Sequence, residues 1–169
     1  MSAFETTPET ARGRSIYRLL LGVHAAIRSD LERVEELAEQ AIHGLPAEEL
    51  RQGLEDLKRD GMLWRLRIHC LYYCRFVHSH HGAEDYAFFP ELREVNPDIN
   101  AIVDRLEADH RRVSDDLDAV EAAANALLED VSQPARQAVA DALHVLADRL
   151  LEHLDFEERN LETTVLRLP

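Results

Sequence analysis

The sequence contains no apolar run close to the roughly 20 residues that a membrane-spanning helix needs. Its N-terminus also lacks the basic segment followed by an apolar stretch that is typical of a secretion signal. Both absences favour a soluble protein. We therefore expect a cytoplasmic protein that has no membrane partner.

Positive charge is scarce in this chain. It has 19 Lys and Arg against 33 Asp and Glu, which gives a formal net charge of -14. A nucleic-acid-binding surface needs clustered Lys and Arg to displace counterions from phosphates. We therefore do not expect a nucleic-acid partner.

Cysteine, glycine and proline are also few. The only two cysteines, Cys70 and Cys74, are one helical turn apart, which is the wrong spacing for a CxxC redox pair, and we expect two buried thiols. Six Gly, six Pro and 46% hydrophobic residues in 169 are typical of one soluble domain rich in helix. We expect a single domain over residues 1–169, with residues 1–10 flexible.

Four long segments repeat apolar residues at intervals of three and four, which predicts amphipathic helices. We expect helices over 15–44, 62–95 and 98–129, and a last one that begins near Ser132, a predicted N-cap, and Pro134. A short acidic segment, 46–61, predicts an extra helix between the first two. The sequence has no clear strand. The fold class is therefore all-α, an antiparallel four-helix bundle.

The stretch HSHHGAED, residues 78–85, concentrates histidines and acids on the second helix. His80 and Glu84 are four residues apart and project from one face of the helix. His81 lies about 100° round the helix from His80 and within a turn of Glu84, whereas His78 points away. Alone, such a pair is weak evidence, because His and Glu often share a solvated helix surface.

The fourth helix repeats the pattern in HLDFEE, where His153 and Glu157 again stand four apart. Each motif is preceded by a histidine inside an apolar stripe, His24 in the first helix and His110 in the third. The chain thus reads twice as His followed by HxxxE.

Carboxylates from two helices can bridge two metal ions, and imidazoles can complete each coordination sphere. Mixed nitrogen and oxygen ligands favour iron, with manganese as the second choice. The alternative is a metal-free polar network. Six polar groups that converge in a small core without a cation would carry a heavy desolvation cost.

These motifs resemble the hemerythrin-like HHE cation-binding family, whose pattern is H, HxxxE, H, HxxxE across a four-helix bundle. The resemblance extends from about His24 to Glu158. It implies a di-iron centre of two iron ions, with an oxo or hydroxo bridge, that binds O2, hydrogen peroxide or nitric oxide. The implied bridging ligands are Glu84 and Glu157, and the implied terminal ligands are His24, His80, His110 and His153.

The sequence departs from the oxygen-carrying members of the family at two positions. They have a second histidine four residues after the third-helix ligand, where this chain has Ser114. Their fourth-helix carboxylate is an Asp five residues after its histidine, where this chain has Glu157 at four. The chain thus resembles the four-histidine branch. The open position leaves room for water, peroxide, His81 or a tyrosine.

Tyr17 and Tyr73 each stand seven residues before a candidate ligand, but core aromatics are the simpler interpretation. Asp85 and Glu158 face either the ligand imidazoles or solvent. We expect the other histidines to lie at the surface: His43, His69 and His144.

The resemblance implies a redox-active protein that binds O2 or peroxide, with catalase-like turnover of peroxide as its enzymatic form. The alternative is a non-enzymatic module that binds, senses or stores iron, oxygen or nitric oxide. Whether turnover occurs stays open, as does the choice between a monomer and a homodimer.

Overall fold

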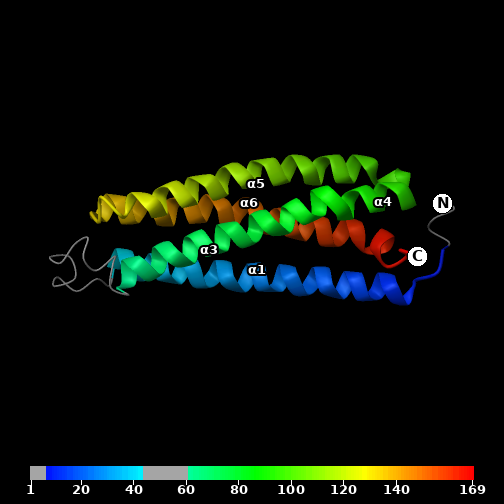
Figure 1. The fold of residues 1–169 in the computed structure, drawn as a ribbon, viewed down its shortest axis with the longest axis horizontal. Coiled ribbons are helices and arrows are strands. Elements are labelled where there is room, and N and C mark those ends of the chain that lie inside the picture. The colour runs from blue at the N-terminus through cyan, green and yellow to red at the C-terminus, as the bar shows by residue number, and fades with distance from the viewer. Residues whose placement is uncertain (1–6, 44–60) are drawn as a thin grey trace.

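Four long helices lie side by side in the computed structural model, which describes residues 7–43 and 61–169 (Figure 1). They are α1 (Ala11–His43), α3 (Met62–Ala83), α5 (Asn100–Ala126) and α6 (Gln133–Val165). Both α1 and α5 pack against α3 and α6, and successive helices run in opposite directions. The described residues contain no strand. The predicted all-α, antiparallel four-helix bundle is confirmed.

Two expectations fall wholly or partly on residues that the structure does not describe. The extra helix predicted over 46–61 lies almost entirely within 44–60, and the segment expected to be flexible begins with residues 1–6. Of the same N-terminal segment, Thr10 is described, and its backbone N–H donates to the carbonyl of Leu166 at 2.9 Å. None of the described helices is both long and apolar enough to cross a membrane.

The predicted helix boundaries hold to within a few residues. The first helix begins at Ala11 rather than Ser15, and the third begins at Asn100, after the short 3-10 helix η4 (Pro97–Ile99). The hydroxyl of Ser132 accepts a hydrogen bond from the backbone N–H of Ala135 at 3.4 Å. Ser132 is therefore the N-cap of α6, as predicted.

The second long helix changes geometry where the candidate ligands lie. α3 ends at Ala83, a π-helical turn, η3, spans Glu84–Phe88, and α4 (Phe89–Val95) follows. The N–H of Phe89 donates to the carbonyl of Glu84, five residues earlier. Such π turns are rare and often occur at functional sites. The sequence-based prediction of one regular helix over 62–95 was wrong at this turn.

Two apolar clusters fill the bundle, one toward each end. The larger cluster contains Ile27, Val77, Val113 and Leu154 among others. The smaller cluster contains Phe89, Leu106, Leu161 and Val165 among others. Along every helix the candidate ligands have residues of the larger cluster on one side. On the other side they have residues that belong to the smaller cluster or pack against it. A polar layer therefore separates the two apolar clusters.

Cys70 and Cys74 are free and buried in the larger apolar cluster, as predicted. Burial raises the pKa of the Cys70 thiol to about 12 and that of the Cys74 thiol further. Both thiols therefore stay protonated near neutral pH and act as packing groups.

Candidate metal centre

The polar layer brings together the six predicted metal ligands and His81, which the sequence left as an alternative ligand. Each long helix, together with the π turn, contributes at least one side chain, and all of them are buried or nearly so. They are His24 from α1, His80 and His81 from α3, Glu84 from η3, His110 from α5, and His153 and Glu157 from α6.

The histidines meet in two pairs. The Nε2 atoms of His24 and His80 are 3.1 Å apart, and those of His110 and His153 are also 3.1 Å apart. Two neutral imidazoles whose Nε2 atoms face each other can present lone pairs toward one point. Each pair therefore forms two sides of a cation site.

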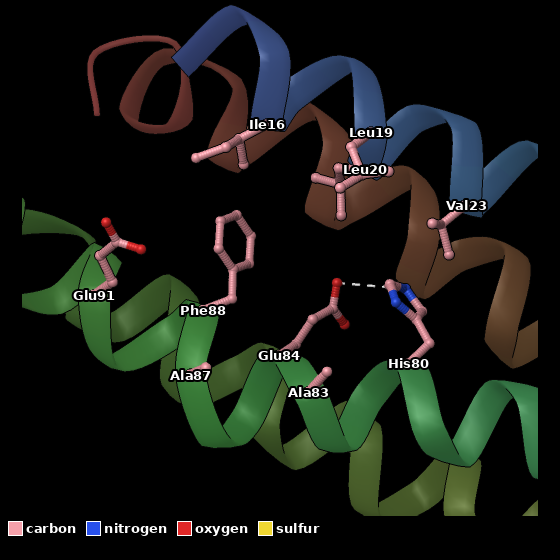
Figure 2. Close-up of a pocket in the computed structure, with 10 residues that line it drawn as sticks. All are labelled: Ile16, Leu19, Leu20, Val23, His80, Ala83, Glu84, Ala87, Phe88 and Glu91. Atoms are coloured by element: carbon pink, nitrogen blue, oxygen red, sulfur yellow. Dashed lines mark ion pairs between the residues drawn. The ribbon is translucent and has the colours of Figure 1, made fainter. Parts of the chain in front are cut away.

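The two buried glutamates lie between the histidine pairs. Glu84 places Oε1 3.3 Å from Nε2 of His80 and Oε2 3.5 Å from Nε2 of His110, and Figure 2 draws the first of these contacts. Oε2 of Glu157 is 3.6 Å from Nε2 of both His24 and His153. Each carboxylate thus touches both pairs, which is the geometry of a bridging ligand.

His81 joins the second pair of histidines. Its ring stacks on that of His110 with centroids 4.0 Å apart, and it meets His153 edge-on at 5.0 Å. The ligand atoms of these three histidines lie within 4.8 Å of one another. His81 therefore adds a third imidazole to this side of the polar layer.

Carboxylates form hydrogen bonds with two of the imidazoles through Nδ1, the ring nitrogen that does not face the other histidines. Nδ1 of His24 donates to Oε1 of Glu158 at 2.9 Å, and Nδ1 of His110 donates to Oδ1 of Asp85 at 2.7 Å. A proton held on Nδ1 leaves Nε2 free to bind a metal. Asp85 and Glu158, which the sequence left facing either the ligand imidazoles or solvent, therefore contact the imidazoles.

The layer carries buried polar atoms that the described protein residues do not satisfy. All four carboxylate oxygens of Glu84 and Glu157, together with Nε2 of His81, are buried without a hydrogen-bond partner in the described part of the chain. Such groups are costly in an apolar interior. A pair of divalent cations would satisfy all five atoms, so the residues present fit a metal centre.

The pKa values also reflect the cost of burying these polar groups without a cation. Burial, reinforced by the charge of Glu157, raises the pKa of Glu84 well above its usual range. Burial raises the pKa of Glu157 to about 8 and lowers those of His80 and His153 to about 4. At pH 7 the metal-free layer therefore holds protonated acids and neutral imidazoles, and a metal would replace the protons.

The remaining candidates lie apart from this layer. Nε2 of His78 is 3.6 Å from Oδ1 of Asp118, on another side of α3. Tyr73 is buried in the larger apolar cluster, and the hydroxyl of Tyr17 lies 3.4 Å from the backbone carbonyl of Glu158. As expected, the histidines at 43, 69 and 144 are exposed.

An apolar cavity of about 340 Å³ opens beside the first histidine pair. It lies between α1 and the segment formed by the end of α3, η3 and α4, and His80 and Glu84 form part of its wall (Figure 2). No motif in the sequence indicates this cavity, because it depends on how far α1 stands from the π turn.

Known families provide an independent comparison. The model of the family described as Hemerythrin HHE cation binding domain matches residues 15–165. The chain belongs to the hemerythrin HHE cation-binding family. Comparison with curated proteins found no match, and neither did comparison with solved structures. As a hemerythrin HHE domain the chain binds cations, and its buried His and Glu clusters fit the metal site at which such domains bind small ligands.

Proposed function

We propose that this hemerythrin HHE domain holds two iron ions and binds O2 or hydrogen peroxide at them. His24 and His80 would ligate the first ion, and His81, His110 and His153 the second. Glu84 and Glu157 would bridge both. The single observation that supports this assignment most is that each buried carboxylate faces both histidine pairs and has no hydrogen bond from the described residues.

The proposed ligand set is unequal, and this inequality supports a binding role. The first ion would have two histidines and the second three, so the first keeps more positions for a small ligand. The cavity beside His80 lies on that side of the layer. Bound iron would supply the electrons for chemistry with oxygen or peroxide. The protein would orient the imidazoles through Glu158 and Asp85 and keep bulk water out with its apolar clusters.

Two forms of this function remain in competition: catalase-like turnover of peroxide, and non-enzymatic binding, sensing or storage. They differ in stoichiometry, because an enzyme consumes many equivalents of peroxide per site and a binding module responds once. A single domain over residues 1–169, a cytoplasmic location and a monomeric or homodimeric state remain predictions.

The direct test is elemental analysis of protein expressed with iron and purified without chelator, with an absorption spectrum of the same sample. We expect about two irons per chain and oxo-to-iron charge-transfer bands near the visible edge, and peroxide consumption would then separate the two forms. A folded protein that holds no metal and takes up no ferrous iron without oxygen would refute the proposal.

His81 provides a test of the unequal ligand set. We expect His81→Ala to lower iron content toward one per chain, because the second site loses one of its three imidazoles, which lie within 4.8 Å of one another. Iron per chain and the charge-transfer bands would be measured. His69→Ala is the control, because His69 is exposed on the same helix. Equal iron content in the two variants would remove His81 from the ligand set.

Iron retention should depend on pH with a definite sign. In the metal-free layer Glu84 and Glu157 have raised pKa values and bind protons that iron must displace, so affinity falls as pH falls below about 8. Histidines whose folded pKa is lowered add to the loss, because below roughly 6.5 protons favour the unfolded chain.

We therefore expect iron to be kept at pH 7.5 and lost below roughly pH 6. The measurement is iron content after dialysis at each pH, with circular dichroism to follow the helices. Raising the pH and adding ferrous iron should restore the metal. Full iron content at pH 5 would contradict the proposed ligands.

A further inference from the structure

We infer that the apolar cavity between α1 and the η3–α4 segment binds a neutral alkyl compound, whose hydroxyl or hydroperoxyl end lies against His80 and Glu84. The cavity measures about 340 Å³, whereas one water molecule occupies about 30 Å³ in the liquid. O2 or hydrogen peroxide alone would leave most of this space unfilled. The inference names a ligand class for the proposed metal centre and rests on that centre for any chemistry at its polar end.

The walls of the cavity are hydrocarbon. From α1, Ile16, Leu19, Leu20 and Val23 point toward η3 and α4, and Ala83, Ala87 and Phe88 face them across the gap (Figure 2). Leu19 is 68% exposed, although it is a leucine of a bundle helix. An alkyl chain in the cavity would cover this side chain and take its own surface out of water.

The inner end of the cavity is polar and built of buried groups. Glu84 is 3% exposed, and both of its carboxylate oxygens lack a hydrogen bond from the described residues. Its Oε1 lies 3.3 Å from Nε2 of His80, which also lines the cavity. In the metal-free protein a terminal O–H group that enters here meets a carboxyl group with no partner among the described residues, while the alkyl part of the molecule meets the apolar walls.

Charge restricts the ligand further. Glu84 and Glu91 are the acids that line the cavity, and none of its described lining residues is Lys or Arg. Arg12 is the cation paired with Glu91, 2.7 Å from its Oε1, and it also donates to the carbonyl of Pro169 at 2.9 Å. A carboxylate in the cavity would meet the charge of Glu91 at the outer end and would find no lining Lys or Arg to pair with, so the ligand is neutral.

Equilibrium dialysis with 1-octanol and octanoate tests the inference on the full chain, with iron measured on the same samples. We expect saturable binding of about one octanol per chain, and octanoate binding at least tenfold weaker. We use 1-octanol as the probe because it is an unreactive analogue of an alkyl hydroperoxide. Equal binding of the two probes, or no saturable octanol binding, would overturn the inference.

A pair of variants locates the site. Ala87 lines the cavity and Ala101 does not, and both are exposed helical alanines, on η3 and α5 respectively. We expect Ala87→Phe to weaken octanol binding at least tenfold and Ala101→Phe to leave it unchanged, with equal helical circular dichroism and iron content. Two outcomes would overturn the inference. One is octanol binding that Ala87→Phe leaves unchanged. The other is a homodimer that binds no octanol and that Ala87→Phe dissociates, because the second copy would then be what covers the cavity.

The two proposals fail separately. Octanol binding by protein that takes up no iron would refute the metal centre and leave the cavity assignment standing. Iron-loaded protein that binds no octanol would refute the cavity assignment alone.

Discussion

Replacement of Glu84 by alanine is expected to remove most of the bound iron. Glu84 lies 3.3 Å from His80 and 3.5 Å from His110, so, like Glu157, it reaches from one histidine pair to the other. Without it, each proposed ion loses a ligand and the two positive charges lose part of their neutralisation. We expect iron to fall from about two per chain to well below one, measured by elemental analysis after gel filtration.

His78→Ala is the control for this result, because His78 lies about one and two-thirds turns before Glu84 and contacts Asp118 instead of the polar layer. It should keep the iron content of the unmodified protein. If both variants lost iron equally, the assignment of the ligand face on α3 would be wrong. Circular dichroism would establish that both variants keep their helices.

Glu157→Gln is expected to change stability in opposite directions with and without iron. The folded pKa of Glu157, about 8, lies above its unfolded value of 4.5. Its proton therefore favours folding at low pH, and this contribution is lost as the pH rises through 8. At pH 9 the metal-free chain must bury a charge that glutamine lacks. We expect the glutamine variant to be more stable by on the order of 3 kcal/mol.

With iron bound, the same change removes a bridging ligand, and the variant should unfold at a lower urea concentration than the unmodified protein. Urea unfolding at pH 6 and pH 9, with chelator and with iron, measures both effects. Near pH 6 the metal-free difference should be smaller but still present, because Glu157 is then protonated in the folded chain and ionised in the unfolded chain, so that folding must take up a proton. Glu152→Gln is the exposed control on α6. No gain at pH 9 without metal would show that Glu157 pays no burial cost.

The parts of the structure that the sequence predicts well are those that depend on helical periodicity. The repeat of apolar residues is enough to locate the four long helices, and a spacing of four places His80 with Glu84 and His153 with Glu157 on one face. Buried positions such as His24 follow from the apolar residues around them. These inferences need only the geometry of a single helix.

Features that depend on contacts between helices are less visible in the sequence. His81 lies about 100° from His80 round α3, and only the approach of α5 and α6 decides that its ring stacks on His110. Asp85 contacts His110 from the π turn, and no residue pattern that we used in the sequence indicates such a turn. The cavity depends on the distance between α1 and that turn.

The π turn also changes which residues of this helix can face the same way: the ligands before it and the packing residues after it. If Glu84–Phe88 formed a regular α-helix with no residue removed, the segment that follows would be rotated by about 100°. Phe89 and Leu92 would then leave the smaller apolar cluster, while His80 and His81 stayed in place. The π turn thus allows one continuous helix to direct His80 and His81 into the polar layer and Phe89 and Leu92 into the smaller apolar cluster.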